Sequence, residues 1–147
     1  MFFLVEYIRK EQVISFNRLV TAEYHQPHAV LQEASIDHYL ERVRHYAENI
    51  EDGKERLFRK AAYLLLHLAQ DSHAFSDGNK RTAYLATGFF LMKNRYFFSS
   101  GPAGQNEGAE MMREIAKGKK SITAITQWLT KHSSFMPEIT DGDISRG

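Results

Sequence analysis

Nine consecutive residues, His73 to Arg81, combine side chains that could carry out one chemical step on a phosphate group. They read His-Ala-Phe-Ser-Asp-Gly-Asn-Lys-Arg. The imidazole of His73 can accept a proton from an attacking hydroxyl. The carboxylate of Asp77 is an oxygen ligand suited to Mg²⁺, which usually takes one or two carboxylates together with substrate phosphates. The loop therefore predicts a general base and a metal ligand within one short segment.

The second half of this string predicts a phosphate-binding helix start. Gly78 tolerates a positive φ angle, and Asn79 tolerates it better than most residues, so the chain can turn sharply here. The backbone N–H groups near Asn79 and Lys80 would then be the free donors of a helix N-terminus, which bind anions. Arg81 can add a bidentate contact to a phosphate oxygen. Phe75 is apolar between polar neighbours, so we expect it to point inward and anchor the loop.

Together these parts suit phosphoryl or nucleotidyl transfer, in which catalysis consists mostly of positioning and charge stabilisation. Each part alone is a weak sign. A single histidine at a helix end is more often a packed or capping residue, and Asp-Gly-Asn is a common turn. The complete string, with helical patterns on both sides, is much harder to obtain by chance.

The elements that must position this loop are predicted to be helices. Apolar residues recur at helical spacing, and glycine, proline and turn-forming residues separate the recurrences. Residues 80–94 are apolar almost all round, which predicts a buried central helix with a rigid N-terminus at the motif. Residues 96–98 are a candidate extended segment. We expect an all-α domain of about six helices, over residues 11–24, 31–47, 54–71, 80–94, 106–117 and 121–132.

Length and composition are those of an ordinary globular protein. The 147 residues fit a single domain, and 43% hydrophobic and 25% charged residues are typical proportions. We expect the domain to cover residues 1–132 and the polar stretch 133–147 to form a flexible C-terminal tail. The net charge of +1 gives no polyanion signal, so no nucleic-acid partner is expected. The chain has no cysteine, and its longest apolar stretch is too short to span a bilayer. We therefore expect a cytoplasmic protein that does not enter a membrane.

The string from His73 to Arg81 resembles the signature of the Fic/Doc family, H-x-F-x-D/E-G-N-G/K-R. Fic proteins transfer AMP from ATP to target hydroxyls, and the Doc branch consists of toxins of toxin–antitoxin pairs and includes a protein kinase. The resemblance covers roughly residues 10–132 and implies Mg²⁺ as cofactor, ATP as co-substrate and a protein target. By position it implies that His73 is the general base, Asp77 the Mg²⁺ ligand, Phe75 the core anchor, and Gly78, Asn79, Lys80 and Arg81 the phosphate-binding residues.

The chain departs from both branches of the family. Lys80 occupies the second glycine position, which resembles the Doc branch, and Tyr84 stands where Fic enzymes usually carry a second arginine. Asp77 and Gly78 keep the Fic form, whereas the Doc kinase has Asn-Ala there. We therefore predict Doc-like phosphoryl transfer to a Ser, Thr or Tyr hydroxyl of a target protein, by a toxin. AMP transfer is the alternative, and a catalytically silent binding module is a second alternative that the intact His73 and Asp77 disfavour.

The same resemblance raises the question of a target-binding flap and of an inhibitory helix in two further segments. Residues 46–55 precede the motif by about the distance at which Fic-like folds place a hairpin flap, which holds a target segment by strand-like pairing. An ordinary helix–helix turn is an equally good interpretation. The inhibitory pattern of Fic proteins, S/T-x-x-x-E-G/N, has only a loose match at Ser134–Glu138, where Pro137 disfavours a helix. Inhibition is therefore expected from a separate antitoxin.

Seven histidines raise the question of a metal site. His25 and His28 are close in sequence, and His38 and His45 are two turns apart on one predicted helix. Neither pair has the close spacing of a zinc-binding helix motif. We interpret them as solvated surface histidines.

Overall fold

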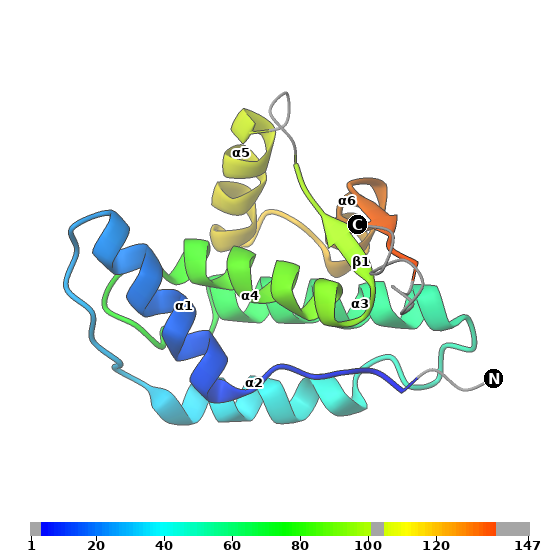
Figure 1. Ribbon diagram of the computed structural model, residues 1–147, viewed down its shortest axis with the longest axis horizontal. Helices are drawn as coiled ribbons and strands as arrows, with labels where there is room; N and C mark the ends of the chain where they lie inside the picture. The colour runs from blue at the N-terminus through cyan, green and yellow to red at the C-terminus, as the bar shows by residue number, and fades with distance from the viewer. Residues whose placement is uncertain (1–3, 101–104, 138–147) are drawn as a thin grey trace, which may run out of the picture.

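The computed structural model describes residues 4–100 and 105–137. This part of the chain contains six helices and one small antiparallel sheet (Figure 1), which confirms the predicted fold class. No predicted helix boundary differs from the observed one by more than two residues. The elements are α1 (Lys10–Glu23), α2 (Glu33–His45), α3 (Gly53–Gln70), α4 (Asn79–Lys93), β1 (Tyr96–Phe98), α5 (Gln105–Ala116), α6 (Ile122–Lys131) and β2 (Ser133–Phe135).

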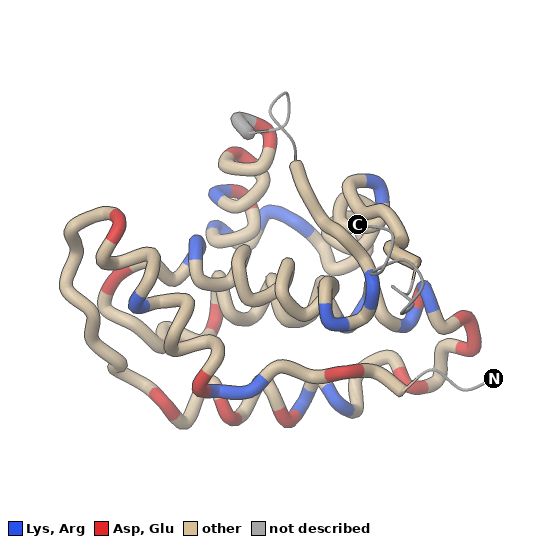
Figure 2. The backbone as a smooth tube through the Cα atoms, viewed as in Figure 1, with Lys and Arg blue, Asp and Glu red and all other residues tan. Residues whose placement is uncertain are grey.

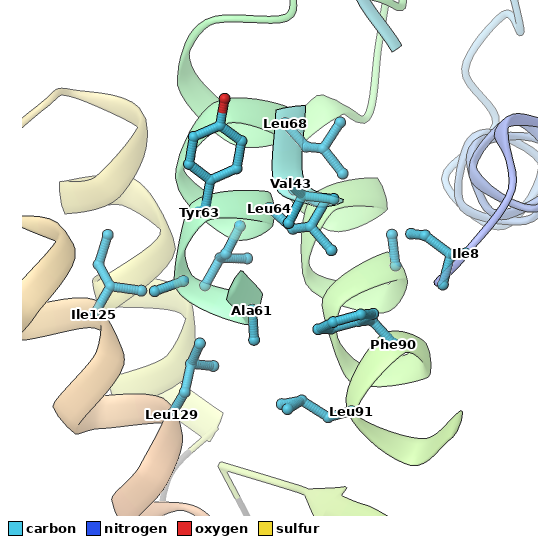
Figure 3. Packing of buried hydrophobic residues seen from close by; sticks show 14 of the residues in the cluster. Ile8, Val43, Ala61, Tyr63, Leu64, Leu68, Phe90, Leu91, Ile125 and Leu129 are labelled. Carbon is cyan, nitrogen blue, oxygen red and sulfur yellow. The ribbon is translucent and has the colours of Figure 1, made fainter. Parts of the chain in front are cut away.

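The two helices on either side of the motif form the centre of the molecule. Helices α3 and α4 run antiparallel along each other, and the motif loop joins them at one end (Figure 1). Helices α1 and α5 and strand β1 also pack against α4, while α2, α5 and α6 pack against α3. Figure 3 shows the resulting core, with Leu64 and Leu68 of α3, Phe90 and Leu91 of α4, and Ile125 of α6. The motif is thus held by the two most heavily packed helices.

Small side chains let α3 and α4 approach closely. Ala61 and Ala62 of α3 and Ala83 and Ala86 of α4 have no exposed surface. Because α4 has neighbours on several sides, it is the central helix that the sequence predicts, but one face remains open. Leu85 is 38% exposed and Met92 50% exposed, so the apolar character of this helix is not fully covered.

A lysine from α3 donates hydrogen bonds to the main-chain carbonyl oxygens at the carboxyl end of α2. The Lys60 side chain is completely buried, and its Nζ donates to the main-chain oxygens of Val43 at 3.0 Å and Arg44 at 3.1 Å. The carboxylate of Glu48 lies 3.2 Å away. The last carbonyls of a helix have no partner within the helix, and a cation there also interacts favourably with the helix dipole. Lys60 therefore fixes the end of α2 that is remote from the motif.

Of the two interpretations of residues 46–55, the ordinary helix–helix turn is confirmed over residues 46–52, and the hairpin flap is contradicted. Ile50 N–H donates to the Ala47 oxygen at 3.1 Å, and the Asp52 carboxylate accepts from the Glu55 N–H as the N-cap of α3. The turn and the motif lie at opposite ends of α3 (Figure 1). A helix of 18 residues is about 27 Å long at 1.5 Å per residue. This distance prevents the turn from holding a target hydroxyl at His73.

Regular structure continues beyond the boundary expected at residue 132. Strand β2 pairs antiparallel with β1, with Ser134 opposite Phe97, and Met136 N–H donates to the Arg95 oxygen at 2.7 Å. Ser134 therefore lies in a strand rather than in an inhibitory helix. Glu138 and the remainder of the expected tail, through residue 147, lie outside the described residues.

Charges of both signs are interspersed along the backbone. Figure 2 shows acidic positions along α2 followed by basic ones at its carboxyl end, while α4 carries its charges near its two ends only. Lys10 of α1 joins two helices by contacting Glu33 and Asp37 of α2, each at 3.2 Å. These carboxylates raise the pKa of Lys10. Among the described residues, none of the helices combines the length and apolarity needed to cross a membrane.

Candidate active site

The motif loop begins where α3 ends. The Ser72 N–H donates to the His67 oxygen at 2.9 Å, and its hydroxyl donates to the Leu68 oxygen at 3.0 Å. The next residue, His73, has a φ of 45°, a left-handed conformation that is uncommon outside glycine, although histidine is among the enriched residues. Its side chain is exposed and makes no hydrogen bond within the described part of the chain. The imidazole is thus available to a substrate.

An extended segment ahead of α2 pairs with the motif loop. The Ala74 oxygen accepts from Leu31 N–H at 2.7 Å and from Gln32 N–H at 3.1 Å. Val30 and Phe75 form an isolated antiparallel bridge. Phe75 is 4% exposed and belongs to the core cluster. The loop is therefore held by main-chain pairing on one side and by a buried aromatic ring.

Asn79 closes the loop on itself. Its Oδ1 accepts from Phe75 N–H at 3.2 Å, and its Nδ2 donates to the Phe75 oxygen at 2.8 Å. Both polar atoms of this side chain are therefore occupied inside the loop. The group that Asn79 can offer to an anion is therefore its backbone N–H, not its side-chain amide.

Helix α4 begins without a side-chain cap. Gly78 is the N-cap residue, with a φ of 77°, and among the described residues no side chain caps this first turn. The first intrahelical bond runs from Thr82 N–H to the Gly78 oxygen at 2.9 Å. The N–H groups of the first turn therefore lack a helical partner, as at any helix start. Together with the helix dipole, such groups form an anion-binding site.

We predict that alanine has opposite effects at the two glycines of this region. A Cβ on Gly78 would lie 3.0 Å from the Val20 side chain and 3.3 Å from Asn17, in a left-handed backbone. Gly78→Ala is therefore expected to lower the free energy of unfolding by about 1–3 kcal/mol. A Cβ on Gly88, within α4, would meet no neighbouring side chain within 4 Å, so Gly88→Ala is expected to raise it by about 0.5–1 kcal/mol. Urea unfolding of both variants checks the pair, and equal effects at the two sites would contradict the strained turn.

Lys80 and Arg81 face a cavity beside the start of α4. The cavity has a volume of about 470 Å³ and lies between α1, α4 and α5. The guanidinium carbon of Arg81 lies 3.6 Å from the centroid of the Tyr24 ring, a cation–π contact that leaves the edge of the guanidinium available. Neither His73 nor Asp77 lines this cavity. Its lining residues are Val20, Glu23, Tyr24, Lys80, Arg81, Tyr84, Leu85, Ser100, Gly108, Ala109, Met112 and Arg113.

Tyr84 takes part in the wall of the same cavity. Its hydroxyl lies 2.9 Å from the Ser100 Oγ, and its ring contacts Phe98 at 5.4 Å between centroids. The position that would carry a second arginine in Fic enzymes therefore holds an aromatic side chain. Arg113 of α5 contributes a further positive charge to the cavity wall. Its distance from the motif in the sequence gave no indication that the two lie together.

Sequence reasoning also missed a buried polar group beneath the motif turn. Asn17 of α1 has no exposed surface, and its Nδ2 donates to the Asp77 main-chain oxygen at 2.8 Å. His28 Nδ1 lies 2.8 Å from Asn17 Oδ1. His28 is therefore not the solvated surface histidine that we expected. One signal was present in the sequence, since Asn17 lies four residues after Val13 and three before Val20, both buried, and this spacing places it on the inward face of α1.

The carboxylate of Asp77 is better suited to a magnesium ion shared with a nucleotide than to a metal site built from protein ligands alone. It is half-buried and makes no hydrogen bond within the described residues, so its oxygens are available as ligands. The described part of the chain holds no group of three or more His, Cys, Asp or Glu side chains that could hold a metal. Mg²⁺ commonly binds through one or two carboxylates and the phosphates of a nucleotide. One carboxylate beside an uncapped helix N-terminus is compatible with that arrangement.

Comparison with known proteins assigns the chain to a family. The model of the Fic/DOC family matches residues 6–91, more than half of the chain, including the motif and helices α1 to α3. No curated protein was found to be similar to the chain. Members of the matched family are typically transferases that modify proteins, using a nucleotide and Mg²⁺. On the strength of this match, the chain belongs to the Fic/DOC family.

Proposed function

We propose that this protein transfers a phosphoryl group from ATP to a Ser, Thr or Tyr hydroxyl of a target protein. The observation that carries the proposal is the uncapped start of α4, at which Gly78 adopts a left-handed turn. Lys80 and Arg81 add two positive charges beside the free N–H groups and face a cavity. Its volume of about 470 Å³ lies within the range of small-molecule sites. This combination suits a phosphate group with an attached nucleoside.

In the proposed reaction, His73 accepts the proton of the target hydroxyl while the hydroxyl oxygen attacks phosphorus. A new bond forms between this oxygen and phosphorus, and the bond from phosphorus to the bridging oxygen breaks. Transfer of the γ-phosphoryl group releases ADP. The first turn of α4 and Arg81 hold the phosphate oxygens and stabilise their charge. The carboxylate of Asp77 would hold Mg²⁺, which neutralises phosphate charge when bound.

The orientation of the nucleotide decides the product. With the γ-phosphate at His73 the enzyme is a kinase, whereas with the α-phosphate there it transfers AMP and releases pyrophosphate. Lys80 favours phosphoryl transfer because it resembles the Doc branch. Tyr84 favours it as well, because it replaces the second arginine of Fic enzymes and so removes one phosphate contact. Asp77 and Gly78 retain the Fic form, so AMP transfer is the alternative. The Doc-like features also support a role as a toxin that a separate antitoxin neutralises.

ATP labelled separately at its α and γ positions distinguishes the two reactions. The purified protein is incubated with cell lysate, Mg²⁺ and each labelled nucleotide, and protein-bound label is measured. We expect label from the γ position to appear on a target and label from the α position to remain in solution. Protein-bound label from the α position would instead identify AMP transfer, and the mass of the adduct would confirm it. Failure of both labels to reach protein would contradict the enzymatic proposal.

A further inference from the structure

A wholly buried side-chain amide lies between the motif turn and the rest of the fold. Asn17 Nδ2 donates to two acceptors, the Asp77 main-chain oxygen at 2.8 Å and the Thr82 hydroxyl at 3.1 Å. These acceptors stand on either side of Gly78, one before the turn and one in the first turn of α4. Asn17 thus spans the glycine that opens the proposed anion site, and its Nδ2 would lie 3.3 Å from a Cβ at that glycine.

The contacts fix which way the amide points. A main-chain carbonyl oxygen only accepts, so the amide nitrogen must face Asp77, and Oδ1 must face His28. His28 Nδ1 lies 2.8 Å from that oxygen, so this ring nitrogen carries a proton and donates. The ring of His28 also packs near Phe75, with centroids 6.3 Å apart. All polar atoms of the Asn17 side chain are therefore partnered, and each partner lies on or beside the motif.

We infer that Asn17 is a positioning residue for the motif, a role that rests on the proposed function. It holds the main chain of Asp77 and so sets the direction of the carboxylate that would bind Mg²⁺. Through its hydrogen bond to Thr82, it also fixes the orientation of the first turn of α4 and of the free N–H groups there. A buried amide with both donors satisfied resists displacement, because a rotated group would leave an unpaired polar atom in the core. The turn is thereby held in one geometry before the nucleotide binds.

The test compares two buried polar residues at opposite ends of the fold. Asn17→Asp keeps the shape and the acceptor for His28 but removes both donated hydrogen bonds. Lys60→Met removes the buried ammonium at the remote end of α2 and serves as the control for lost stability. For each variant, thermal unfolding, kcat, KM for ATP, the Mg²⁺ concentration for half-maximal rate, and the NMR signals of the motif amides are measured.

We expect Asn17→Asp to lower kcat about 10–100-fold, the range for partners that orient metal ligands, and to raise the Mg²⁺ requirement. The amide signals of Asp77 and Gly78 should shift. Lys60→Met should lose thermal stability while kcat, the Mg²⁺ requirement and those signals stay unchanged. If Asn17→Asp lowers only thermal stability, the residue is structural and the inference fails.

Two further outcomes separate this inference from the proposed function. If the wild-type protein transfers nothing but Asn17→Asp still shifts the Asp77 and Gly78 signals, the positioning role stands and the proposed function fails. If Asn17→Asp does not fold, Thr82→Val replaces it, since this variant removes one partner of the amide and keeps the shape of the side chain. Unshifted motif signals and an unchanged Mg²⁺ requirement in Thr82→Val would then overturn the inference.

Discussion

Replacing His73 by alanine is expected to lower the rate of transfer by about 10²–10⁴-fold, the usual contribution of a general base. The imidazole is exposed, and it makes no hydrogen bond within the described residues. Its removal therefore leaves no buried group without a partner, and the thermal midpoint should change little. The rate is measured with labelled ATP and the modified target, and the fold is checked by thermal unfolding of the same samples.

His25→Ala is the matched control for this variant. His25 is also exposed and also has a left-handed backbone, with a φ of 54° against 45° for His73. The conformational cost of alanine is therefore similar at the two positions, and only the change at His73 should remove activity. Expression in a host adds a second measurement, because wild type and His25→Ala should slow growth while His73→Ala should not. Equal slowing by all three would instead favour a binding module.

Asp77→Asn is the second change with a large expected effect. The substitution keeps the shape of the side chain and removes the charge that would hold Mg²⁺ beside the nucleotide phosphates. We expect the rate at saturating ATP to fall on the order of 10²-fold or more, because the metal neutralises charge that develops during transfer. A titration with Mg²⁺ should show partial recovery at high concentration. The main-chain oxygen that accepts from Asn17 is unchanged, so the turn should persist.

Asp71→Asn provides the comparison for the loss of one carboxylate. Asp71 is the C-cap residue of α3, and its carboxylate pairs with His67 of the same helix. This variant loses the same charge within the same loop region, yet its rate and Mg²⁺ dependence should match the wild type. Asp77→Asn with an unchanged Mg²⁺ dependence would show that another group holds the metal.

The sequence by itself determined the helices and the chemical character of the motif. Helical periodicity depends on residues three and four positions apart, and the stripe over residues 54–71 predicted α3 within one residue at each end. The left-handed turn at Gly78 was likewise predictable, since glycine is the residue that adopts it most readily. These features are local, so a single chain segment contains the information that specifies them.

Only the tertiary structure decided which distant residues meet the motif. Asn17 lies 60 positions before Asp77. Its spacing from Val13 and Val20 places it on the inward face of α1, but nothing in the local sequence shows which residue it contacts there. The flap interpretation had another origin, the family resemblance, although the helix predicted over residues 54–71 already separated that segment from His73. Distance along the sequence does explain the missed contacts of Asn17. It also explains β2, whose partner strand stands more than 30 positions earlier. Such contacts depend on how the helices pack, and the local sequence around each side chain does not specify its long-range partners.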